Sequence, residues 1–469
     1  MLFLQELPVG EYQFKYIVTY SEENLAGETL SVSTESEIAA VTIELQEGIW
    51  EGEGIETSPY LIKNKDDLKK LSDLASQSSF KDKYFKFADE IDGEKGISLP
   101  ENWKPIGTKD KPFAGTIDGN NKKLVVPKGE KALIGVPFGA SLKNLSIYGE
   151  EIKGNGVVNN YSLTGVSGEA IRIEKVTLLS GTHTELSGFV GGYASGSYTV
   201  TLIDCTVQQG VVIGDGEKCN IGSFGGEFNG TMQNCKSAAV VNGKDFVGGI
   251  VGNKGQSMGA FKIENCEFSG TVNASGKYVG GIAGSGYGGT VFGFGSAGNT
   301  PMVTISRCKV SGDINAGNYA GGILGAEACL VQCWENGAGN IDNNLFIGSL
   351  NCEGDCKGAI IGFMGSLNRY TNIYNNAYKA ECGAKKGIGC IRIIDTDSKT
   401  AAKDTSEVIY LDSSSGKSIS KFPESIKMTD YVIYEKDERF TNYSIRSNHQ
   451  RSDDPLGADA AKLTRKATE

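Results

Sequence analysis

The sequence predicts a mainly β protein: a parallel β-helix, or β-solenoid, preceded by a small helical and β cap. Two recurring patterns indicate this fold. Short apolar phrases such as "IENCEF" at Ile263 return about every 30 residues, and glycine pairs such as "VGGIVG" at Val247 accompany them. Self-similarity at a steady period is the signature of a repeat architecture, in which each unit forms one coil of a stack.

One position of the repeat is expected to form a column inside the rod. Successive copies place there Leu145, Val176, Cys205, Cys235, Cys266, Cys308, Asn344 and Asn376. An apolar residue stands three positions before each of them, and an apolar residue stands two positions after all of them except Cys235. An offset of two keeps both side chains on one face of a strand, whereas an offset of three requires a bend between them.

Asparagine and glycine are expected to make the corners of each coil. The residue before the column is Asn in several copies, and Asn tolerates the left-handed backbone conformation. The glycine pairs are expected to form a second corner, where φ is positive and backbones approach closely. The predicted structural ladder therefore comprises thiols that act as small buried hydrophobes, and corner amides: Cys205, Cys235, Cys266, Cys308, Asn234, Asn265, Asn343 and Asn375.

Composition shifts divide the chain into four predicted regions. Residues 1–47 alternate like three strands and suggest part of an immunoglobulin-like sandwich, which needs about seven. Residues 48–130 are expected to cap the β-helix with a helix at about 65–76, for which Asn64 is the N-cap, and with strands joined by an Asp-Gly turn. Residues 131–394 carry the repeats, and residues 395–469 hold C-terminal cap strands and a polar tail.

The repeats resemble the GLUG-motif family of bacterial cell-surface proteins. The resemblance lies in "GTIDGNNKKL" from Gly115, in the "VGGIVGN" and "VGGIAGS" runs, and in the "IENCEFSGTV" phrase, and it extends from about Gly48 to Ile394. It implies a β-helix that serves as a stalk or module. Some members resemble zinc peptidases of the immunoglobulin-A-protease type, but this sequence contains no H-E-x-x-H pair.

Charge and composition disfavour some classes of binding partner. The 469 residues carry a net charge of −11, which disfavours binding to nucleic acid or to an anionic membrane. No apolar run approaches the roughly 18 residues of a membrane span, and the first residues lack the features of a signal peptide. Any export is therefore expected to be encoded outside this sequence.

Motifs for catalysis, metals and cofactors are sparse, and we predict no cofactor and no catalytic residue. His183 and His449 lie in glycine-rich or polar contexts and are expected at the surface. No glycine-rich run matches a phosphate loop. The pairs Cys329/Cys333 and Cys352/Cys356 could form a four-thiolate metal site, but core thiols or a local disulfide are the preferred interpretation.

These observations favour a non-catalytic, extracellular surface protein, a stalk or adhesin segment that presents a binding face to a glycan or protein of a host or cell surface. The inserted loops 285–301 and 325–340 are the predicted face, with the aromatic anchors Tyr287, Phe292, Phe294 and Trp334. One alternative is a polysaccharide lyase or glycoside hydrolase on a β-helix. The other is a filament subunit that self-associates by strand complementation through its N-terminal strands.

Overall fold

The computed structural model of the 469-residue chain describes most of the cap and repeat regions. The described residues are 10–23, 28–43, 49–131, 133–154, 156–159, 167–185, 187–191, 197–254, 261–285, 303–327, 339–365, 371–374, 376–379, 381–385, 387–392, 408–409 and 431–434.

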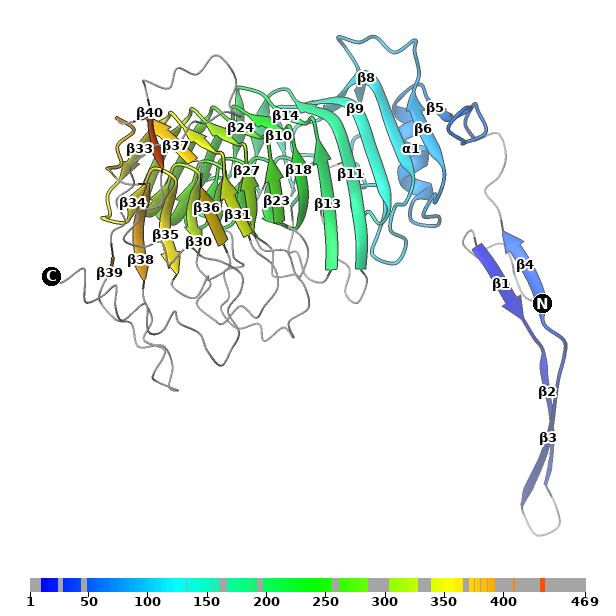
Figure 1. Cartoon of the computed structure of the whole chain (residues 1–469). Helices are drawn as coiled ribbons and strands as arrows, with labels where there is room; N and C mark the ends of the chain where they lie inside the picture. The colour runs from blue at the N-terminus through cyan, green and yellow to red at the C-terminus, as the bar shows by residue number, and fades with distance from the viewer. Residues whose placement is uncertain are drawn as a thin grey trace.

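The repeats form a parallel β-helix, as expected. Strands of successive coils lie side by side in sequence order along a rod (Figure 1), and they pair in parallel. Three sheets run along the rod, which we call sheets 1, 2 and 3 in the order in which a coil passes through them. Coils built from short strands bury their apolar faces only against neighbouring coils, so the stack shares one core.

The strands of each sheet follow the chain. Sheet 1 contains β5 (Tyr60–Ile62), β6 (Tyr84–Phe87), β7 (Ile97–Ser98), β8 (Thr116–Val126), β9 (Ala140–Gly149), β11 (Ser167–Leu178), β13 (Ser197–Ile203), β14 (Thr206–Val207), β18 (Gly230–Gln233), β19 (Lys236–Ser237), β23 (Phe261–Glu264), β24 (Glu267–Phe268), β27 (Thr304–Ser306), β28 (Lys309–Val310), β31 (Gly339–Asp342), β32 (Leu345–Phe346), β36 (Thr371–Tyr374), β37 (Asn376–Lys379) and the antiparallel β40 (Tyr431–Tyr434). Sheet 2 contains β10 (Glu151–Ile152), β12 (Gly181–His183), β15 (Val211–Ile213), β16 (Ile221–Gly222), β20 (Val240–Gly243), β21 (Val247–Gly248), β25 (Thr271–Gly280), β29 (Asp313–Gly321), β33 (Ser349–Cys352) and β34 (Lys357–Gly358). Sheet 3 contains β17 (Gly225–Phe228), β22 (Val251–Lys254), β26 (Ala283–Ser285), β30 (Leu324–Glu327), β35 (Ile361–Gly365), β38 (Ile388–Arg392) and the antiparallel β39 (Val408–Ile409).

The cysteine column lies inside sheet 1, one thiol per coil. The backbone N–H that follows each cysteine donates to the preceding coil: Lys236 to Cys205, Glu267 to Cys235 and Lys309 to Cys266, each at 2.9 Å. Cys205, Cys235, Cys266 and Cys308 are buried free thiols. The column continues in Asn344, whose Oδ1 accepts from the Cys308 N–H at 2.8 Å, and then in Asn376, whose Oδ1 accepts from the Asn344 N–H at 3.0 Å.

A left-handed residue precedes the column and makes the predicted bend. Asn234, Asn265 and Asn343 have φ of 56°, 53° and 54°. Lys175 and Arg307 adopt the same conformation at φ of 53° and 56°, so the corner does not require Asn. Asn375 lies outside the described residues.

The glycine pairs allow close packing and do not make a positive-φ corner, which corrects the expectation. The left-handed residues of that second corner are Phe246, Tyr278 and Tyr319, at φ of 57°, 65° and 51°. A Cβ on Gly284 would lie 2.5 Å from the backbone of Phe246, and a Cβ on Gly248 would lie 1.9 Å from the Val251 carbonyl oxygen. Sheets 2 and 3 therefore pack backbone on backbone here, which only glycine permits.

The cap contains the helix α1 (Lys65–Leu74), close to the expected span. Asn64 is its N-cap, and its Oδ1 accepts from the N–H groups of Asp66 and Asp67 at 2.9 and 3.2 Å. The described residues contain no helix long and apolar enough to cross a membrane. The expected Asp-Gly turn is wrong, because β8 continues through Asp118–Gly119 and bends at the left-handed Asn120 and Asn121.

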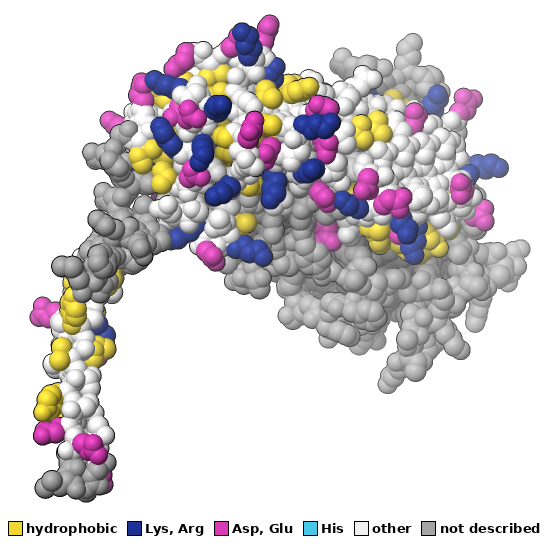
Figure 2. Space-filling view, turned by 180° about the vertical axis from the view of Figure 1, so that it is seen from behind, with side chains coloured by type: hydrophobic (Ala, Val, Ile, Leu, Met, Phe, Trp, Pro, Cys, Tyr) yellow, Lys and Arg dark blue, Asp and Glu magenta, His cyan; other side chains and the backbone are white. Residues whose placement is uncertain are grey.

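The N-terminal region contains four strands, not the three expected. They form two antiparallel pairs, which together we call the ribbon. Strand β1 (Gly10–Phe14) pairs antiparallel with β4 (Ala39–Ile43), and β2 (Ile17–Glu23) pairs antiparallel with β3 (Thr29–Glu35). Hydrophobic side chains lie along it (Figure 2), and Val18, Tyr20 and Val32 are 62, 64 and 72% exposed. Whether the ribbon belongs to a sandwich stays a prediction.

His183 is buried, so its expected place at the surface is wrong. It occupies an inner column of sheet 2, where Ile152 and Ile213 are its register partners in the adjoining coils. The side chain is 1% exposed, and neither ring nitrogen has a hydrogen-bond partner. Burial lowers the pKa of His183 to about 4, because an apolar column disfavours the charged imidazolium. His449 lies outside the described residues.

Candidate functional site

The predicted aromatic anchors do not define a site in the described structure. Tyr287, Phe292, Phe294 and Trp334 all lie outside the residues that it describes. The described surface offers a different candidate, a groove on the outer face of sheet 2.

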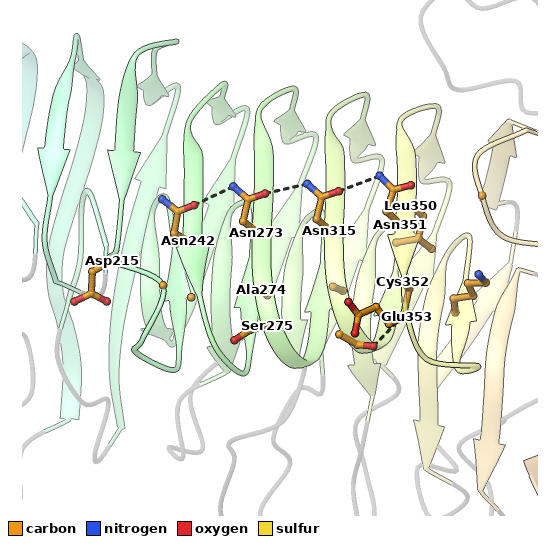
Figure 3. A pocket seen from close by; sticks show the side chains of 16 residues that line it. Asp215, Asn242, Asn273, Ala274, Ser275, Asn315, Leu350, Asn351, Cys352 and Glu353 are labelled. Atoms are coloured by element: carbon orange, nitrogen blue, oxygen red, sulfur yellow. Dashed lines mark hydrogen bonds between the residues drawn. The ribbon is translucent and has the colours of Figure 1, made fainter.

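The groove follows a row of four asparagines, one from each of four successive coils. Asn242, Asn273, Asn315 and Asn351 extend from β20, β25, β29 and β33, and Figure 3 shows them in line. Each amide donates its Nδ2 to the Oδ1 of the preceding asparagine, at 2.9 Å in all three contacts. Because parallel register stacks identical side chains one strand spacing apart, the row is continuous.

Small residues, whose side chains alternate toward the core, form the floor of the groove beside this row. Gly243, Ala274, Ala316 and Cys352 are register partners, and Gly317 follows Ala316. A volume of about 1000 Å³ lies above them. The other lining residues at the margins include Asp215, Ser275, Glu353 and Lys357. The absence of large side chains from the floor lets a ligand approach the strand backbone.

The carboxylates of the groove are too far apart to act together. Asp215 and Glu353 are separated by four coil steps, which is about 19 Å at the ~4.8 Å spacing of paired strands. Paired glycosidase carboxylates lie roughly 5–10 Å apart. The backbone N–H of Glu217 donates to Asp215 and lowers the pKa of its carboxyl, as do Lys218 and further backbone groups, so Asp215 is a poor proton donor near neutral pH.

Carboxylates of sheet 1 are held in ion pairs, one within strand β23 and two between neighbouring coils. Glu264 contacts Lys262 at 2.9 Å and Arg307 at 3.2 Å, and Glu267 contacts Lys309 at 3.0 Å. Such pairs are typical of a solvated β surface and contribute at most about 1 kcal/mol each. They do not converge on one point.

The described thiols do not assemble a metal centre. No group of three His, Cys, Asp or Glu side chains in the described part of the chain could hold a metal ion. Cys352 is a free thiol, and burial raises its pKa, whereas Cys356 is disulfide-bonded. The four-thiolate alternative therefore lacks one thiolate, and Cys329 and Cys333 lie outside the described residues.

The asparagine row could have been found in the sequence. Each asparagine stands seven residues after the inner column: Asn242 after Cys235, Asn273 after Cys266, Asn315 after Cys308 and Asn351 after Asn344. The pattern was missed because polar residues on the outward face of a strand usually signal only exposure to solvent.

Comparisons with known proteins give one distant structural match. No protein-family model matches the chain, and no curated protein matches it. A crystal structure of a Bacteroides ovatus protein, named provisionally as an immunoglobulin A1 protease, is 20% identical and superposes with a TM-score of 0.39 over 65% of this chain and 81% of that one. At this similarity the match carries no argument about function.

Proposed function

We propose that the chain is a non-catalytic rod of a cell-surface protein, a stalk or adhesin segment whose groove on sheet 2 binds a neutral glycan. The observation that carries the proposal is the row of four asparagine amides above a floor of Gly and Ala. Repeats of this kind, which resemble the GLUG-motif family, also suit a stalk. Placement outside the cell follows from that resemblance and is part of the proposal.

The chemistry of the groove favours neutral sugars. Each amide has donors and an acceptor, so it can match hydroxyl groups, which both donate and accept. A net charge of −11 disfavours polyanions, and Asp215 and Glu353 outnumber Lys357 among the charged residues named at the groove margins. The distance between the two carboxylates argues against hydrolysis in this groove.

Binding to soluble neutral oligosaccharides and polysaccharides tests the proposal, with calorimetry and a glycan array. We expect the single variants Asn273→Ala and Asn315→Ala to weaken binding at least tenfold, because each removes one amide and breaks the row on both sides. Asn265→Ala is the control, since it removes the amide contact to Asn234 (2.7 Å) on sheet 1, away from the groove. Equal affinities of all the variants, or no ligand on a broad array, would contradict the groove as a binding site.

Glycan cleavage remains the enzymatic alternative. Incubation with acidic and neutral polysaccharides, followed by a reducing-end assay, separates it from binding. Turnover that survives purification would replace the non-catalytic proposal.

Filament assembly is a second candidate, and the exposed apolar face of the N-terminal ribbon favours it. An isolated two-stranded hairpin is marginally stable in water, so a third strand or a covering surface would stabilise it. Light scattering tests this candidate: a species that stays monomeric at high concentration counts against self-assembly.

A further inference from the structure

Three polar residues, Asn220, Glu227 and Asn253, lie close together at sheet 3, away from the groove. At Gly252 the absence of a side chain lets the neighbouring backbone segments pack closely. A Cβ on Gly252 would lie 2.5 Å from the carbonyl carbon of Asn220 and 2.8 Å from the carbonyl oxygen of Gly226. The segments that carry Asn220, Glu227 and Asn253 therefore pass within contact of one another.

One hydrogen bond and the strand register place these three residues next to one another. Asn220 donates its Nδ2 to Oε1 of Glu227 at 3.0 Å. Glu227 and Asn253 are register partners on β17 and β22, so they lie on the same face of sheet 3, one strand apart. Their side chains are 8 and 1% exposed.

The amide groups have capacity for further bonds. Neither Oδ1 nor Nδ2 of Asn253 has a hydrogen-bond partner, and Oδ1 of Asn220 also has none. A buried polar group left unsatisfied destabilises the folded state, because it has lost its hydrogen bonds to water. An amide buried as deeply as Asn253 therefore indicates a ligand that accepts electron pairs or hydrogen bonds at this point.

We propose that Asn220, Glu227 and Asn253 bind a hard divalent cation of the calcium class. These three side chains carry amide and carboxylate oxygens, which Ca²⁺ prefers, and they offer no thiol or imidazole for a softer metal. Lys254, the next residue on β22, pairs in register with Phe228, so strand alternation directs its ammonium group to the opposite face. The cation would connect β17 and β22 of sheet 3 with Asn220, the residue directly before β16.

Calcium binding to the full chain tests the site. The chain is first treated with a chelator, then titrated with CaCl₂ alone in a calorimeter, and its thermal unfolding is followed with and without the ion. Glu227→Gln removes the charge and Asn253→Leu removes the amide oxygen at nearly constant volume. Asn265→Ala, at a corner of sheet 1 away from this site and from the groove, is the matched control.

We expect one calcium ion per chain, a rise in the unfolding temperature, and at least a tenfold loss of affinity in Glu227→Gln and Asn253→Leu, with no loss in the control. Because a variant can fail to fold, Asn253→Asp gives a second test: a second carboxylate is expected to tighten calcium binding and to enlarge the calcium-dependent rise. No calcium uptake by the native chain, or equal uptake in all variants, would overturn the site. A wild type unaffected by calcium alongside a stabilised Asn253→Leu would also overturn the site, because it would show that the amide is buried without a ligand.

Discussion

His183 is an ionisable side chain inside an aliphatic column. Folding moves its imidazole from water to a position between Ile152 and Ile213, where neither ring nitrogen finds a hydrogen-bond partner. Its sequence context, "GTHTELSG", is polar, and the buried position became evident only when the coil register was known. Glycine and threonine around a strand residue do not indicate which way that residue points.

This burial predicts a loss of stability in acid. The folded-state pKa of His183, about 4, lies below the usual 6.5, so the unfolded chain binds more protons between these values. The contribution is therefore intact above pH 6.5 and is lost as the pH falls toward 4, by roughly 2–3 kcal/mol at pH 4.5. Urea unfolding at pH 7.5 and 4.5 measures it. His183→Leu should be less sensitive to acid than the wild type, and equal sensitivity would contradict the prediction.

Cys205 and Cys266, two thiols of the inner column, should be chemically silent in the folded protein. Burial raises the pKa of Cys205 and of Cys266, and alkylation requires the thiolate. At pH 8, iodoacetamide should therefore label the partly exposed Cys219 well before Cys266, and mass spectrometry of peptides would give both rates. Labelling in urea, where all thiols are accessible, is the control. Equal rates in the folded protein would show that the column opens.

The elements of the coil depend on two kinds of left-handed corner. The bend before the inner column was predictable, because an odd offset between two inward residues demands it and Asn accommodates it. The second corner was not, because it places Phe246, Tyr278 and Tyr319 at positive φ, where bulky residues are rare. The ring centroids of Phe246 and Tyr278 lie 5.0 Å apart, and those of Tyr278 and Tyr319 lie 5.3 Å apart. The three residues with positive φ therefore also stack their rings on one another.

Glycine at the contact between sheets 2 and 3 should therefore be irreplaceable. Gly284→Ala places a Cβ 2.5 Å from the backbone of Phe246 and Val247, and we expect a loss of about 3 kcal/mol or more in the free energy of unfolding. Gly93→Ala is the control, because nothing lies within 4 Å of its Cβ position, and it should change stability by less than about 1 kcal/mol. Denaturant titration of both variants makes the comparison, and similar values would contradict the packing argument.

In the whole molecule, the β-helix was predictable from the sequence, whereas the pairing of the N-terminal strands was not. Repetition specified the β-helix, because Cys205, Cys235, Cys266 and Cys308 recur with apolar companions at constant offsets. The ribbon was less predictable, since its strands pair as β1 with β4 and β2 with β3, and local alternation cannot distinguish that nested pairing from a sandwich fragment. The candidate groove was predictable in principle, because an asparagine recurs seven residues after the inner column in four copies. Finding it required the outward-facing positions of the repeat to be compared as well as the inward-facing ones.

Ribbon and rod should unfold independently. The ribbon strands pair with one another, and Val18, Tyr20 and Val32 are mostly exposed. Removal of residues 1–47 should therefore leave the unfolding temperature of the remaining chain within about 2 °C, as measured by calorimetry, and a larger decrease would show that the ribbon supports the rod.

The asparagine row on sheet 2 also has a direction. Every contact in it runs the same way, so Asn242 presents an amide nitrogen at one extremity and Asn351 an oxygen at the other. The aligned amide dipoles make the two extremities electrically unlike. An oligosaccharide whose termini differ would consequently be held in a single polarity, with its reducing terminus always toward the same end of the rod.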